Sequence, residues 1–124
     1  MVIRTGSCRC GAVRFEVAGE PLRTGLCHCT ECRKTSGSVF SCYAVWPRSA
    51  FTSTGTFSTY AGDSFCSACG SQMFSLGSAE AEIKLGSLDQ APTGLSPTYE
   101  LWIKRREGWL HALPGADQFA EDRV

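Results

Sequence analysis

Eight cysteines are the residues of this 124-residue chain with the clearest capacity for chemistry. Seven of them fall into three tight clusters, with the spacing C-x-C at 8–10, C-x-C-x-x-C at 27–32 and C-x-x-C at 66–69. Cysteines that lie so close in sequence are poor disulfide partners for each other, whereas their thiolates can chelate one metal ion. The spacing therefore favours metal binding over a disulfide framework. The eight are Cys8, Cys10, Cys27, Cys29, Cys32, Cys42, Cys66 and Cys69.

The first and third clusters together predict a closed structural zinc site. On an extended strand, residues i and i+2 face the same side, so Cys8 and Cys10 direct both sulfurs one way. Cys66 and Cys69 are typical of a zinc knuckle, and Gly70 permits the tight turn that follows. Two cysteines from each cluster supply the four ligands of a tetrahedral structural zinc. Two separate reduced pairs are the alternative.

The second cluster, Cys27, Cys29 and Cys32, supplies three thiols, which is the number of protein ligands in a catalytic zinc site. His28 could be a fourth ligand. In an extended segment, however, its ring points away from its two cysteine neighbours, so we expect it to pack or hydrogen-bond nearby. Cys42 lies in the apolar run SVFSCYAVW, where a lone cysteine is usually a small buried hydrophobe. Ligation by Cys42 stays an alternative, as does an iron–sulfur cluster, although the spacing is not a ferredoxin run.

The rest of the chain predicts a mainly β fold of small sheets pinned by metal. Residues 12–17 alternate, with Val13, Phe15 and Val17 on one face. Thirteen glycines and five prolines divide the strand-like runs into short pieces. Further strands are expected at 56–62, 81–87 and 98–104, a loop at 90–97, and short helical turns at 30–34, where Thr30 could be the cap, and at 117–122.

Composition limits the classes of partner. The length predicts a single domain over residues 1–124. The formal net charge is zero and no stretch is strongly basic, which argues against a nucleic-acid partner. The apolar runs are too short to span a membrane. The start MVIRTGSCRCGAVRF has no apolar signal region, so we expect a cytoplasmic protein whose thiols stay reduced. A dimer is possible, but no residue argues for one.

Several segments resemble the glutathione-dependent formaldehyde-activating enzyme family, whose domain is similar to that of centromere protein V. They are GSCRCGAVRFEV, LCHCTECRKTSGSVF, FCSACGSQMF, LGSLD and YELWIKRREGWL. The resemblance runs from about Gly6 to near the C-terminus, and the ordered set of three cysteine clusters is its specific part. It implies a mainly antiparallel, zinc-bound β structure called a β-tent.

The resemblance also implies two zinc ions per chain and an activity. By position, the structural zinc falls on the four cysteines of the first and third clusters, and the catalytic zinc falls on the second cluster, in agreement with the spacing. The small-molecule thiol would be glutathione, and the reaction would be carbon–sulfur lysis or synthesis of S-hydroxymethylglutathione. Candidates for contact with the carboxylates of glutathione are Arg33, Lys34, Ser36 and Gly37, although Arg33 and Lys34 would equally suit a solvated face.

Two other functions are compatible with this sequence. One is a zinc-stabilised binding module without turnover, and the other is a lyase or carrier for a different thiol adduct. An enzyme needs the zinc at Cys27, Cys29 and Cys32 to exchange its fourth ligand, whereas a binding module does not.

Overall fold

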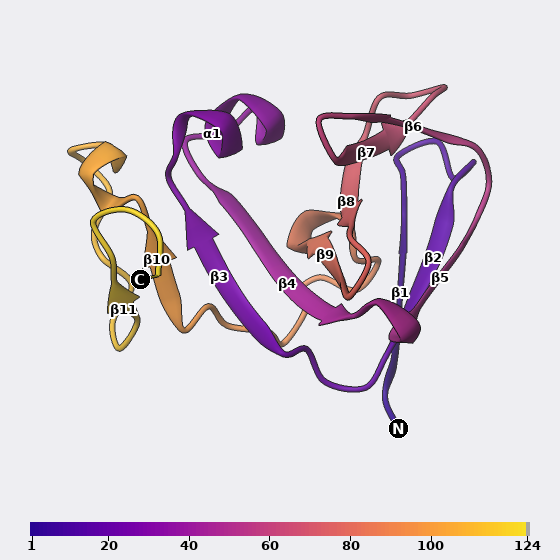
Figure 1. Ribbon diagram of the computed structural model, residues 1–124, viewed down its shortest axis with the longest axis horizontal. Coiled ribbons are helices and arrows are strands. Elements are labelled where there is room, and N and C mark those ends of the chain that lie inside the picture. Colours follow the sequence, from indigo (N-terminus) through magenta and orange to yellow (C-terminus); the bar gives the residue numbers. More distant parts are fainter. Residues whose placement is uncertain (124) are drawn as a thin grey trace.

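Two β-sheets build residues 1–123, which are the residues that the computed structural model describes (Figure 1). The smaller sheet is antiparallel and has the order β1-β2-β5, with β1 at Ile3–Ser7, β2 at Arg14–Ala18 and β5 at Phe51–Thr54. The larger sheet has the order β11-β10-β3-β4-β9-β8-β7-β6. Its strands are β3 (Arg23–Cys27), β4 (Ser41–Pro47), β6 (Phe57–Tyr60), β7 (Asp63–Cys66), β8 (Gln72–Leu76), β9 (Glu80–Lys84), β10 (Tyr99–Leu101) and β11 (Asp117–Gln118). The prediction of a mainly β fold is confirmed.

One end of the larger sheet is parallel. β10 pairs in parallel with both β3 and β11, while the other pairs of this sheet are antiparallel. A tight hairpin enforces antiparallel pairing, whereas a long connection does not. The structure confirms the loop expected at 90–97, through which the chain reaches β10. This long connection allows β10 to run parallel to β3.

A single α-helix, α1 (Thr30–Ser36), lies within residues 1–123, where a helical turn was expected. Its cap is Cys29 rather than Thr30, because Cys29 has extended backbone angles and its Sγ accepts a hydrogen bond from the Cys32 N–H at 3.3 Å. Gly37 ends the helix in the left-handed conformation, at φ 67°. Short 3₁₀ helices lie at Arg48–Ala50, Leu85–Ser87 and Ile103–Arg105.

Three further local expectations were wrong in whole or in part. The strand expected at 81–87 ends at Lys84, where the 3₁₀ helix Leu85–Ser87 follows. Residues 117–122 were expected to be helical, but they begin with strand β11, since the N–H groups of Asp117 and Phe119 bond to the carbonyls of Thr98 and Glu100 at 2.9 and 3.0 Å. Pairing with the edge of β10 therefore outweighs the helical preference of residues 117–122. The strand expected at 98–104 stops at Leu101, because Trp102 takes a left-handed φ of 56°.

The main core lies between the two sheets. Val13, Phe15 and Val17 are fully or almost fully buried, which confirms the alternation seen in the sequence. The larger sheet contributes Ala44, Trp46, Phe74, Ala81 and Ile83 to the same core. The Phe74 ring makes edge contacts with Phe15, Phe51 and Phe57 at centroid distances of 4.8 to 5.4 Å.

The opposite face of the larger sheet carries reactive and charged side chains. The strand register places Cys27 beside Ser41, Tyr43 beside Lys84, and Val45 beside Glu82. Because side chains alternate along a strand, these residues all point away from the main core. No helix within residues 1–123 is long and apolar enough to cross a lipid bilayer.

Candidate metal centres

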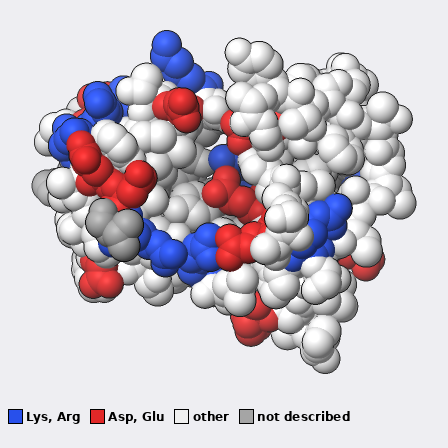
Figure 2. All heavy atoms as spheres, viewed as in Figure 1, with Lys and Arg blue, Asp and Glu red and all other residues white. Residues whose placement is uncertain are grey.

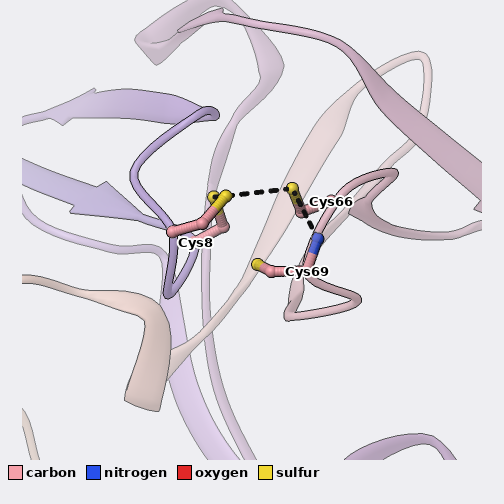
Figure 3. Close-up of side chains that lie close together, drawn as sticks. Cys8, Cys66 and Cys69 are labelled. Carbon is pink, nitrogen blue, oxygen red and sulfur yellow. Dashed lines mark hydrogen bonds between the residues drawn. The ribbon is translucent and has the colours of Figure 1, made fainter.

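Four thiols from two distant segments meet at the first centre. The sulfurs of Cys8, Cys10, Cys66 and Cys69 lie within 4.8 Å of one another. Figure 3 shows the labelled sulfurs of Cys8, Cys66 and Cys69 facing a common point. The Cys8–Cys10 and Cys10–Cys66 sulfur distances are 3.6 and 3.8 Å. A tetrahedral zinc with bonds of about 2.3 Å to sulfur requires sulfurs about 3.8 Å apart, so the four thiols fit such an ion.

The local backbone at this centre differs from the expected strand. Cys8 and Cys10 lie in a turn that follows β1, in which the Gly11 N–H bonds to the Cys8 carbonyl at 3.1 Å. The sulfurs converge because the turn folds back, not because the segment is extended. Across the cluster, Gly70 has φ 77° in the knuckle turn, as the sequence predicted.

Backbone and hydroxyl donors lower the pKa of two of the four thiols, Cys8 and Cys69. The backbone hydrogen bond from Ala12 lowers the pKa of Cys10, but the bond to Cys8 and burial outweigh it and raise that pKa to about 11. The Val13 N–H donates to Cys8 Sγ at 3.2 Å, and this bond lowers the pKa of Cys8. The N–H groups of Ala68 and Cys69 both lie 3.4 Å from Cys66 Sγ. Ser71, which the sequence analysis missed, bonds through its hydroxyl to Cys69 Sγ at 3.2 Å and lowers the pKa of Cys69 to about 5. Negative sulfurs are what a metal ligand set requires.

The four-thiol centre joins the two sheets. Cys8 follows β1 of the smaller sheet, and Cys66 ends β7 of the larger one. Both are buried in the main core, whereas Cys10 and Cys69 are exposed at its rim. A metal ion held here would therefore cross-link the two sheets at the edge of their shared core.

Three thiols form the second centre, at the junction of β3 and α1. Cys27 ends β3, Cys29 caps α1 and Cys32 lies in the first helical turn. Their sulfurs lie within 4.8 Å of one another, and no further histidine, cysteine or carboxylate of residues 1–123 joins this group. The hydrogen bond from the Cys32 thiol lowers the pKa of Cys27 to about 6 despite burial, and the same bond raises the pKa of Cys32. The group thus gives up a first proton near neutral pH, which prepares it for a cation.

His28 points away from the three sulfurs, as expected from its place between two cysteines. Its side chain is buried, and its Nε2 lies 2.8 Å from Glu100 Oε1. The backbone N–H of His28 also donates to the Leu101 carbonyl at 3.0 Å. His28 therefore ties the metal-binding loop to β10.

Glu100 was not identified from the sequence, although a charged residue within a strand-like run is a usable signal. Burial raises its pKa. The hydrogen bonds from the Leu113 N–H, His28 and Gln118, together with the charge of Arg106, outweigh that effect and lower the pKa to about 2. Glu100 is therefore a buried carboxylate that stays ionised.

Cys42 lies on the other face of the sheet. It stands beside Leu26 in the strand register, while its neighbour Ser41 stands beside Cys27. Burial raises the pKa of Cys42 to about 11, which suits an inert thiol. The residue behaves as the small hydrophobe that the sequence favoured.

A pocket of about 520 Å³ opens over the three thiols, within the roughly 300–1,000 Å³ usual for small-molecule sites. Cys27, Tyr43 and Glu82 from the sheet form its floor. Its walls are the loop and helix start at residues 29–32, and Leu101, Trp102, Arg105 and Asp122 from the C-terminal part. Figure 2 shows a hollow near the middle of this face, with both acidic and basic side chains inside it. The sequence analysis missed Glu82, Trp102 and Arg105, which only the fold brings to the thiols.

Gly25 on β3 lets β10, which carries the pocket residue Leu101, approach closely. A Cβ at residue 25 would lie 2.4 Å from Cζ of the Tyr99 ring, which covers the glycine. The Tyr99 hydroxyl in turn bonds to the Tyr43 hydroxyl at 3.0 Å. The absence of a side chain at Gly25 thus seats β10 against β3 and fixes one wall of the pocket.

The four residues predicted to contact substrate lie elsewhere on α1. Arg33 pairs with Glu107 at 2.6 Å, and the Ser36 hydroxyl donates to the Phe40 carbonyl at 3.1 Å. Lys34 is exposed and Gly37 is the helix C-cap. The structure does not bring any of the four to the pocket lining, and their contact with substrate stays a prediction.

Two comparisons with known proteins bear on these centres. A family model described as glutathione-dependent formaldehyde-activating enzyme matches residues 3–105, a range that contains both cysteine groups. The crystal structure of a Rhodobacter sphaeroides protein, a structural genomics target, is similar to this chain with a TM-score of 0.54 and 23% sequence identity. The match covers 75% of this chain and 91% of that one. At this identity the likeness indicates a shared fold.

Proposed function

This chain belongs to the glutathione-dependent formaldehyde-activating enzyme family, and on that premise we propose that it is a zinc-dependent carbon–sulfur lyase. Its substrate would be the adduct of glutathione and formaldehyde, S-hydroxymethylglutathione, or a related thiol adduct. The observation that carries the proposal is the contrast between the two thiol groups. Four thiols enclose one point at the core edge, whereas three converge at the floor of an open pocket.

The two groups would hold one zinc ion each. Cys8, Cys10, Cys66 and Cys69 complete a tetrahedron by themselves, which suits a structural ion. Cys27, Cys29 and Cys32 would hold the second zinc ion, which would leave room for an external thiol and would favour its thiolate form.

The chain's own residues would contribute position rather than acid–base chemistry. In the synthetic direction, the thiol sulfur forms a bond to the carbonyl carbon of formaldehyde, and the thiol proton ends on the carbonyl oxygen. The reverse breaks the carbon–sulfur bond, and no oxidation occurs in either direction. Leu101 and Trp102 narrow the space beside the three thiols, so they would keep the two reactants in contact. Burial and the bond to Tyr99 raise the pKa of Tyr43, so its hydroxyl stays protonated on the pocket floor.

A reducing compartment fits this chemistry. All eight cysteines are free thiols. We therefore propose that the protein works in the cytoplasm, where such thiols persist and can bind metal.

Exchange NMR on glutathione and ¹³C-labelled formaldehyde tests the proposal. The reaction runs without a catalyst, so the rate constant is the quantity to compare. We expect the zinc-loaded protein to accelerate exchange, and Cys29→Ser to reduce that acceleration about 100-fold or more, since residues that only support metal ligands already cost roughly 10- to 100-fold. Cys42→Ser is the matched control and should keep the activity, because Cys42 lies on the other sheet face. No acceleration by a protein with both centres loaded would overturn the proposed activity.

A further inference from the structure

Resting on the proposed function, we propose that the pocket selects its thiol by a cationic amino group and that Glu82 is the main anchor for that group. The substrate class is then a thiol that carries an ammonium group, with a carboxylate as its second charged feature. Neutral thiols and purely anionic thiols would bind less well.

The charges of the pocket favour a cation. Three acidic residues line it, Glu31, Glu82 and Asp122, against one basic residue, Arg105. Three thiolates around a divalent zinc add a further net negative charge. A thiol whose only charge is negative therefore meets repulsion, whereas an ammonium group meets attraction.

Glu82 occupies the centre of a longer groove. It lines the pocket over the thiols and also two adjoining hollows, one beside Asp63 and Lys84 and the other beside Arg23 and Tyr99. Its position on β9, beside Val45 of β4, places its side chain on the face away from the main core. A ligand that extends from the thiols in either direction passes this carboxylate.

The Glu82 carboxylate has capacity for another donor. Lys84 Nζ lies 3.4 Å from Glu82 Oε2, but the same ammonium also donates to the Ser41 hydroxyl at 3.2 Å. The Glu82 side chain is 34% exposed, against 13% for Lys84, so the carboxylate is the more open partner. A carboxylate offers about four acceptor sites, of which this pair uses one.

Aromatic walls add to the attraction for a cation. Tyr43 forms part of the floor and Trp102 part of the wall, and ring faces attract ammonium groups. The Trp102 ring is already engaged by cations of this chain, with Lys104 Nζ 4.9 Å and Arg105 Cζ 5.4 Å from its centre. The aromatic attraction for a ligand ammonium therefore rests on Tyr43. Its indole N–H donates to Asp122 Oδ1 at 2.9 Å, which holds that carboxylate at the pocket.

Arg105 completes the set as the partner for a carboxylate. Arg23 and Arg123 line the adjoining hollow. Arg23 forms two hydrogen bonds with Glu80 at 2.9 and 2.8 Å, and Arg123 lies over the Tyr99 ring with its Cζ 5.3 Å from the ring centre, so both are engaged. An acidic and aromatic floor with one arginine at the wall matches an amino-acid-like end that has both an ammonium and a carboxylate group.

Glutathione and N-acetylglutathione form a matched pair for the test, because they differ only at the amino group. We would measure the dissociation constants of both for the zinc-loaded protein by calorimetry, and the formaldehyde exchange rates with both by NMR. We expect glutathione to bind about tenfold more tightly, the gain expected of one charge-assisted contact. Glu82→Gln should bring the ratio close to one. Glu20→Gln, a change at an exposed residue paired with Arg4 and outside the groove, should keep the tenfold preference.

The possible outcomes distinguish amino-group selection by Glu82 from the proposed lyase activity. Equal dissociation constants in the wild type would overturn the proposal without any variant, so a Glu82→Gln protein that fails to fold does not block the test. A preference that survives in folded Glu82→Gln would also overturn it. A preference for glutathione without any acceleration of exchange would support the amino-group selection and overturn the proposed lyase activity. No binding of either thiol would overturn both.

Discussion

A buried hydrogen bond between His28 and Glu100 holds the three-thiol centre in place from behind. His28 lies between two of the cysteines, and its bond to Glu100 connects them to β10 and to the C-terminal segment. Both side chains are 2% exposed. Removal of one partner of a buried hydrogen bond is costly, because the other partner is left buried and unsatisfied.

Replacement of Glu100 by Gln should therefore destabilise the protein markedly. We expect a loss of about 3 kcal/mol in the free energy of unfolding, because the buried carboxylate accepts hydrogen bonds from several groups and lies beside Arg106. Urea unfolding in excess zinc measures this loss. Glu20→Gln is the control, since an exposed pair contributes about 0–1 kcal/mol. Equal losses in the two variants would show that the His28–Glu100 pair does not support the loop.

The effect of Glu100→Gln should depend on pH in a defined direction. The pKa of Glu100 is lowered to about 2 in the folded protein, from an ordinary value of 4.5. Its charge thus adds stability that is complete above about pH 4.5 and is lost as the pH falls towards 2. The stability difference between wild type and variant should shrink from pH 7 to pH 3, while metal release in acid affects both chains alike. A difference that stays constant over this range would contradict the assignment.

The sequence identified the ligands more readily than the residues around them. Cysteines within three positions of each other must lie close in space, so the chain itself determines their grouping. Glu82 reaches the pocket because β9 pairs with β4, and Glu100 reaches His28 because β10 pairs with β3, so both placements depend on strands that lie far apart in sequence. No local pattern encodes such a pairing, so sequence reasoning missed both.

Among the elements, β10 depends most on one small residue. Its Tyr99 ring lies over Gly25, where a Cβ would come within 2.4 Å of the ring. Gly25→Ala should push β10 outwards, destabilise the protein by about 1–3 kcal/mol and widen the pocket. Gly86→Ala is a suitable control, since a Cβ there meets no atom within 4 Å. Thermal unfolding and glutathione affinity of both variants check this, and equal behaviour would contradict the role given to Gly25.

Strands could be predicted where apolar and polar residues alternate along the sequence. They could not be predicted where a strand forms only by pairing with the edge of a sheet. Val13, Phe15 and Val17 predicted β2 and its buried face correctly. The short strand β11 has only two residues and forms because the edge of β10 is free beside it. The early end of β10 follows from the left-handed backbone of Trp102, a conformation that no sequence rule assigns to tryptophan.

For the whole molecule, the two candidate metal centres would have different tasks. The four-thiol centre connects the sheets at their common core, so its loss should affect the entire fold. The three-thiol centre lies on the outer face of one sheet and is supported separately by His28 and Glu100. We therefore expect Cys66→Ser to lower the thermal midpoint in zinc by more than Cys29→Ser does. The reverse order would contradict this division.

The zinc content of the intact chain tests the central claim most directly. Native mass spectrometry of the wild type, Cys29→Ser and Cys42→Ser would count the bound ions. The account predicts two zinc ions per chain in the wild type and in Cys42→Ser, and one in Cys29→Ser with its fold retained. A single zinc in the wild type, lost on substitution of Cys8 or Cys66 but not of Cys29, would contradict a metal at the three-thiol centre.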